Sequence, residues 1–167
     1  MKGLIIIGYQ GIGKTSIGGQ KGCIDLESSN FYIDEKRDKN WYKIYCKIAL
    51  DLANQGYTVF TSSHQEVRDY FAKEINELPK NVASIVIFCP KLTQKKEWIE
   101  RLQERYNKTQ SEKDNRALKS AVENFDNNIR DLIHSNFYCY CPESLDYDLC
   151  DYVFQMRYDW CLNLDKQ

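Results

Sequence analysis

A lysine and a threonine follow a glycine-rich stretch near the start of the chain. Residues 8–15, GYQGIGKT, fit the phosphate-loop pattern G-x-x-x-x-G-K-[ST] at every fixed position. In this pattern the glycines let the backbone approach an anion closely, and successive N–H groups turn toward a polyphosphate. Lys14 would contact the β- and γ-phosphates, and the Thr15 hydroxyl would ligate Mg²⁺. We therefore expect ATP and Mg²⁺ here, bound by Gly8, Tyr9, Gln10, Gly11, Ile12, Gly13, Lys14, Thr15 and Ser16.

Strand and helix patterns alternate along the chain, as they must to position such a loop. Short apolar runs predict strands over residues 3–7, 23–26, 57–61, 82–89 and 137–141. Apolar residues at helical spacing predict helices between them, and a last helix from about residue 144. The polar residues 107–115 predict a loop. This alternation indicates an α/β fold, with a parallel sheet covered by helices on both faces.

Two carboxylates follow the second predicted strand. Alternation along a strand puts Asp25 and Glu27 on one side. Parallel strands end at the edge of the sheet where ligands bind. Asp25 would then orient the metal or an acceptor hydroxyl, and Glu27 and Ser28 would contact the acceptor. The alternative is that this segment is only a polar turn before a helix.

Composition and charge narrow the class of protein. The chain has 167 residues, which predicts one domain over 1–167, and its net charge is -1. We therefore expect neither a nucleic-acid partner nor a membrane, and we expect a cytoplasmic protein without a signal peptide. The seven cysteines are odd in number and include no C-x-x-C, which argues against a zinc site and a disulfide framework. The oligomeric state stays open.

Four segments together resemble the small bacterial and phage P-loop kinases of the adenylate kinase, shikimate kinase and gluconate kinase-like group. They are the loop, residues 24–29 (IDLESS), residues 62–68 (SSHQEVR), and Pro90 followed by residues 98–102 (WIERL). The resemblance implies an ATP:acceptor phosphotransferase with a three-layer α/β/α sandwich and a five-stranded parallel core. It also implies an acceptor region after the second strand and an arginine-bearing helical lid over about residues 91–116. The D-G-x-P-R acceptor signature of adenylate kinases is absent, which leaves the acceptor open.

Four cationic or titratable side chains are candidates for this chemistry. Arg101 and Arg105 are four residues apart and share one face of a predicted helix, from which they could neutralise a transferring phosphoryl group. The alternative is an exposed helix with ordinary ion pairs. His64 and Arg68 begin the helix after the third strand, where they could bind the acceptor or its phosphate.

The sequence favours a kinase over two other classes. We expect transfer of the γ-phosphoryl group of ATP to a small molecule, first a nucleoside or deoxynucleoside monophosphate. A nucleotide-dependent switch is disfavoured because no N-K-x-D signature occurs and no apolar strand ends in a Walker B carboxylate. A polynucleotide 5′-kinase is disfavoured by the near-neutral charge.

Overall fold

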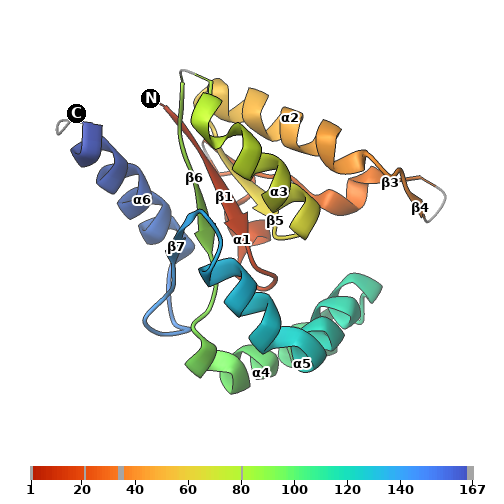
Figure 1. Ribbon diagram of the computed structural model, residues 1–167. Coiled ribbons are helices and arrows are strands. Elements are labelled where there is room, and N and C mark those ends of the chain that lie inside the picture. The colour runs from red at the N-terminus through yellow and green to blue at the C-terminus, as the bar shows by residue number, and fades with distance from the viewer. Residues whose placement is uncertain (1, 21, 34–35, 80, 165–167) are drawn as a thin grey trace.

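Five parallel strands form the centre of the molecule (Figure 1). The computed structural model describes residues 2–20, 22–33, 36–79 and 81–164. The sheet has the order β2-β5-β1-β6-β7, which confirms the prediction of a five-stranded parallel core. Its strands are β1 (Gly3–Gly8), β2 (Cys23–Asp25), β5 (Thr58–Ser62), β6 (Val82–Phe88) and β7 (Tyr138–Tyr140).

The central strand carries the phosphate loop. All six residues of β1 are buried, because helices cover both faces of the sheet and neighbouring strands flank it on both edges. Ile5 lies beside Val59 of β5 and Ile85 of β6 in the parallel register. A continuous run of branched apolar residues suits this position, since neither face of the strand meets water. The loop therefore begins from the most constrained element of the fold.

Helices cover the two faces of the sheet. Helices α2 (Trp41–Asn54) and α3 (Gln65–Glu74) lie on one face, and α6 (Leu149–Leu164) lies on the other, where it contacts the single-turn α1 (Lys14–Ile17) (Figure 1). Helix α2 buries Tyr45 and Ala49 toward the core, at the spacing of one helical face. The shorter elements are η1 (Ser28–Phe31), β3 (Tyr32–Ile33), β4 (Lys36–Arg37), η2 (Ile75–Glu77) and η3 (Leu92–Gln94).

Two long helices extend from the carboxyl edge of the sheet as a hairpin. They are α4 (Lys95–Thr109) and α5 (Glu112–Ile133) (Figure 1). The loop predicted over residues 107–115 is therefore wrong in its extent. Within residues 107–115, Gln110 takes a left-handed conformation, with φ of 51°, and this conformation ends α4. Ser111 then caps α5, because its Oγ accepts a hydrogen bond from Asp114 N at 3.1 Å.

The last helix begins later than the sequence pattern indicates. Helix α6 starts at Leu149 rather than near residue 144, because Asp148 Oδ1 accepts a hydrogen bond from Cys150 N at 2.8 Å and so caps the first turn. Leu149, Val153 and Met156 are buried against the sheet. Among the described residues, none of the helices combines the length and apolar character that crossing a bilayer requires.

Candidate functional site

The loop after β1 folds as the phosphate-loop pattern predicts. Gly11 and Gly13 have φ of 85° and 95°, which only glycine adopts without strain. Gly13 is the residue immediately before α1, so that the loop passes directly from the central strand into a helix. A Cβ on Gly13 would meet no atom within 4 Å, whereas one on Gly11 would lie 2.9 Å from Leu102 Cδ2. The loop is therefore open at Gly13 and closely packed at Gly11.

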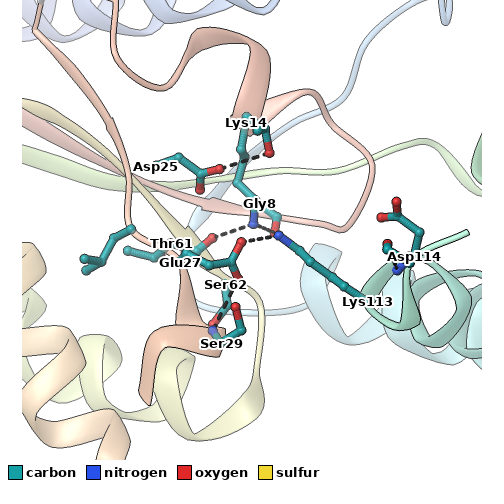
Figure 2. A network of polar contacts seen from close by, with 12 residues as sticks. Gly8, Lys14, Asp25, Glu27, Ser29, Thr61, Ser62, Lys113 and Asp114 are labelled. Atoms are coloured by element: carbon teal, nitrogen blue, oxygen red, sulfur yellow. Dashed lines mark hydrogen bonds and ion pairs between the residues drawn. The ribbon is translucent and has the colours of Figure 1, made fainter. Parts of the chain in front are cut away.

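Lys14 points across the loop toward the carboxyl end of β5. Its Nζ donates to the carbonyl oxygens of Gly8 and Thr61, each at 3.3 Å (Figure 2). Burial lowers the pKa of Lys14, and the carboxylates of Asp25 and Glu27 oppose this effect without cancelling it. The ammonium is therefore poorly solvated, and an added anion would stabilise its charge.

Asp25, the last residue of β2, meets the start of α1. Thr15 Oγ1 donates to Asp25 Oδ2 at 3.3 Å. Strand β2 lies two strands from β1, because β5 is inserted between them. The contact forms nevertheless, because the end of α1 lies directly against β2. Gly18 is so close to this strand that a Cβ added to it would lie 2.8 Å from Asp25 Cβ. The two oxygens predicted as metal ligands are thus neighbours.

Glu27 is ion-paired with the lid hairpin. Lys113, in the first turn of α5, contacts Glu27 Oε2, and Ser29 N donates to Glu27 Oε1 at 3.3 Å (Figure 2). Burial raises the pKa of Glu27, but Lys113, the Ser29 amide and Lys14 together outweigh it and lower the pKa below its usual range. The Glu27–Lys113 pair therefore joins the segment after β2 to the first turn of α5.

A cavity of about 870 Å³ unites these groups. The loop residues Gly8, Gln10, Gly11, Ile12, Gly13, Lys14, Thr15 and Ser16 line it, and so do Asp25, Glu27 and Ser28. Helices α4 and α5 contribute five cationic side chains to its wall, namely Arg101, Arg105, Lys108, Lys113 and Arg116. The structure thus brings together the predicted loop, carboxylates and lid arginines around one space large enough for a nucleotide.

Both predicted lid arginines line the cavity, but each is also held by the protein. Arg101 lies 5.5 Å from the ring of Trp98 and 5.3 Å from that of Tyr147, and it donates to Leu145 O at 3.3 Å. Arg105 pairs with the buried Asp114 at 2.6 Å. Burial raises the pKa of Asp114, but Thr109, Ser111 and Arg105 lower it further than burial raises it. Both arginines are therefore held in place on the cavity wall, where Glu104 and Asp114 partly offset the cationic side chains of α4 and α5.

His64 and Arg68 are one helical turn apart, since Arg68 N donates to His64 O at 3.1 Å, and they share only the smaller of two cavities. His64 lines the large cavity and also a second cavity of about 290 Å³, and its Nδ1 lies 3.0 Å from Ser62 Oγ. Arg68 lines only the second cavity and donates to Asp131 O at 3.1 Å. Its Nε is buried, with no hydrogen-bond partner among the described residues. Arg68 is thus placed for a group beyond the phosphate loop.

Tyr9 differs from the other predicted loop residues. Its N–H donates to Phe88 O at 3.0 Å, and its side chain, only 2% exposed, is outside the large cavity. The lid holds the outer side of the loop, since Trp98 Nε1 donates to Gln10 O at 3.1 Å. Tyr147 Oη also donates to Ile12 O, at 2.9 Å. The Tyr9 amide is therefore already bonded within the protein, and the carbonyls of Gln10 and Ile12 are fixed from outside the loop.

Lys113 and Asp114 also belong to this site, although the sequence patterns did not indicate them. Both fall in the segment predicted as a loop, and both lie in the first turn of α5. The available signal was Ser111 with an acidic residue three positions later, which is typical of a helix N-terminus. Without that helix, nothing in the sequence places Lys113 opposite Glu27, 86 residues away.

Comparison with known proteins fixes the fold and no more. No protein-family model matches the chain, and no curated protein does. A solved structure of a gluconokinase from Sinorhizobium meliloti 1021 is similar with a TM-score of 0.53 and 13% sequence identity. The likeness covers 99% of this chain and 94% of that one. The chain has the P-loop kinase fold.

Proposed function

We propose that this protein is an ATP-dependent phosphotransferase that moves the γ-phosphoryl group to a small anionic acceptor, first a nucleoside or deoxynucleoside monophosphate. One observation carries the proposal. The phosphate loop opens into a cavity of about 870 Å³ to which α4 and α5 contribute five cationic side chains and only two carboxylates, Glu104 and Asp114. Phosphoryl transfer depends mainly on positioning and on neutralising charge, and this arrangement offers both.

The donor side would use the loop and β2. Lys14 and the amides near Gly13 would bind the β- and γ-phosphates. The oxygens of Thr15 and Asp25 suit a hard cation such as Mg²⁺, and their 3.3 Å separation lets both reach one ion or its waters. Such an ion would neutralise charge on the phosphates. Arg101 and Arg105 would face the transferring group from the lid.

The acceptor side would lie at the carboxyl ends of β2 and β5. His64 borders both cavities, so an acceptor that contacts it could extend from the phosphate loop toward Arg68. The buried, unpartnered Nε of Arg68, among the described residues, favours an acceptor with an anionic group. A nucleoside monophosphate and a sugar acid both meet this requirement. The similarity to a gluconokinase gives the sugar acid as the second candidate.

ADP release from ATP·Mg²⁺ tests the proposal. The panel contains nucleoside and deoxynucleoside monophosphates, nucleosides, sugar acids and a 5′-hydroxyl oligonucleotide. We expect one acceptor class to stimulate turnover, and Lys14→Ala to reduce kcat at least ~10²-fold. Arg68→Gln should raise the KM of the acceptor and leave that of ATP unchanged.

The alternatives predict different results. A switch would give slow ATP hydrolysis that no acceptor stimulates, and this result would reject the kinase. A polynucleotide kinase would respond only to the oligonucleotide, with a strong dependence on salt. Equal stimulation of wild type and Lys14→Ala would show that turnover does not come from this site.

A further inference from the structure

Three cysteine thiols far apart in the sequence meet at the β6–β7 edge of the sheet. Cys89 Sγ lies 3.3 Å from Cys139 Sγ and 4.0 Å from Cys141 Sγ, and the latter two are 3.9 Å apart. Cys139 lies in β7 and Cys141 directly follows the strand, and the 3.9 Å between their sulfurs shows that both thiols point to one side. Cys89 N donates to Tyr140 O at 3.1 Å, which holds the third thiol between them.

The sulfur triangle has the dimensions of a thiolate metal site. A tetrahedral zinc ion with Zn–S bonds of about 2.3 Å requires sulfurs about 3.8 Å apart. The three separations here are 3.3, 3.9 and 4.0 Å. A point about 2.3 Å from all three sulfurs lies about 0.8 Å out of their plane, as in a tetrahedral ion with one further ligand.

We propose that Cys89, Cys139 and Cys141 bind one thiophilic d¹⁰ metal ion, Zn²⁺ being the probe, as three thiolates with a water in the fourth position. Binding forms three sulfur–metal bonds and releases three thiol protons to solvent, and no group changes oxidation state. Cys139 and Cys141 are only partly buried, so the ion can enter from solvent, while the fully buried Cys89 closes the inner side. Soft thiolate ligands select this class of metal over Mg²⁺.

Neither apolar packing nor a disulfide accounts for the whole arrangement. A cysteine that acts only as a small apolar side chain has no need to converge with two others. A disulfide requires sulfurs about 2.05 Å apart, uses only two of the three thiols and needs an oxidant. Three thiols at nearly equal separations match the requirements of a metal ion. Within the described part of the chain, Cys23, Cys46 and Cys150 lie outside this cluster.

The site would fasten the loop that leads into the lid. Cys89 and Cys141 are followed by segments that the protein already joins, since Lys91 pairs with Glu143 at 2.6 Å and Gln94 Nε2 donates to Pro142 O at 3.0 Å. A bound ion would add a third link at the base of α4. It makes no contact with the phosphate loop in this proposal, which therefore stands or falls independently of the kinase function.

Zinc binding to the reduced, full-length chain tests the site by competition against a chromogenic chelator. We expect one zinc per chain, and Cys139→Ser and Cys141→Ser should weaken the affinity at least ~100-fold. Cys23→Ser and Cys150→Ser are the matched controls and should bind as wild type does. Titration calorimetry in two buffers of different protonation enthalpy should show release of more than one proton per zinc.

Several results would overturn the proposal. The first is that the wild-type chain takes up less than one zinc ion per chain. The second is that the Cys139 and Cys141 variants bind zinc as tightly as the Cys23 and Cys150 controls. The metal-free chain, denatured without reductant, should contain seven reactive thiols. A count of five reactive thiols in the wild type, together with loss of the disulfide in the Cys139→Ser variant, would reveal a disulfide in place of the metal site. Circular dichroism shows whether each serine variant is folded, which is expected because both substituted thiols are only partly buried.

Discussion

Trp98 of the lid donates its indole N–H to the backbone carbonyl of Gln10 in the phosphate loop, at 3.1 Å. Trp98 is fully buried, so neither the donor nor the acceptor has water as an easy replacement. Helix α4 is therefore bonded in its first turn to the phosphate loop. The shape of the loop depends on a residue about ninety positions further along the chain.

Trp98→Phe tests this dependence. The ring is largely kept, but Gln10 O loses its donor, so we expect the free energy of unfolding to fall by about 1–3 kcal/mol. We also expect weaker ATP binding, since the loop backbone is no longer held. Urea unfolding and nucleotide titration measure the two effects. The buried Trp41, which packs on Tyr45, is the control, because Trp41→Phe should leave ATP affinity unchanged. Equal losses of ATP affinity in both variants would contradict the assignment.

The two left-handed glycines of the loop should respond unequally to alanine. Gly13→Ala adds a methyl group to open space, so its cost is the backbone strain alone, about 1–2 kcal/mol. Gly11→Ala suffers the same strain and also presses on Leu102 Cδ2, 2.9 Å from the new carbon, so its cost should be larger. Unfolding curves of the two variants give the comparison. If the Gly11 variant is as stable as the Gly13 variant, α4 can move away from the loop.

The Glu27–Lys113 pair should contribute little to stability, and only above acidic pH. The Glu27 side chain is 30% exposed and that of Lys113 49%, so Glu27→Gln should cost at most about 1 kcal/mol at pH 7. The pKa of Glu27 is lowered in the folded state, so this contribution is present above the unfolded value near 4.5. It is lost as the pH falls through the lower, folded pKa.

A double-mutant cycle with Lys113→Met isolates the pair. Urea unfolding at pH 7 should show that the double variant loses less than the sum of the single variants, and the coupling should diminish as the pH falls through the lowered, folded pKa of Glu27. Coupling that keeps the same size as the pH falls would mean that the carboxylate charge is not responsible.

Asp114 should be the costliest carboxylate of the lid to remove. Its side chain is 4% exposed, and it accepts from Thr109 Oγ1 at 2.5 Å as well as pairing with Arg105. Asp114→Asn should lower the free energy of unfolding by about 2 kcal/mol, because hydrogen bonds to a buried charge are lost. Asp126, half-exposed in its pair with Lys95, is the matched control, and Asp126→Asn should cost less than about 1 kcal/mol. Thermal unfolding ranks the two variants, and the reverse order would contradict the structural role given to Asp114.

Features encoded locally could be predicted from the sequence. The phosphate loop and the five strands follow from glycine spacing and from short apolar runs. Asp25 could be placed at the site because alternation and parallel topology bring the end of β2 to the same edge as the loop. The start of α5 was missed because Lys113 and its neighbours lack an apolar period, and the helix there depends on the Ser111 cap.

Features that depend on distant pairing could not be predicted. The thiol of Cys89 meets that of Cys139 only because β6 and β7 are neighbours in a fixed register, and spacing rules for metal sites search nearby residues. The position of Arg68 depends in the same way on tertiary packing. Its role toward the acceptor phosphate stays a prediction, but the sequence did not indicate that its guanidinium donates to the backbone of α5 and lines the smaller cavity.

The brevity of the two outermost strands also affects how the protein behaves in concentrated solution. Strands β2 and β7 form the edges of the sheet, and each has three residues. A short edge exposes few unpaired backbone groups, so it is a poor template for a strand from another molecule. The long apolar strands β1 and β6, which would make strong templates, are enclosed between neighbours on both sides. The strand order that positions the phosphate loop therefore also protects the sheet against aggregation.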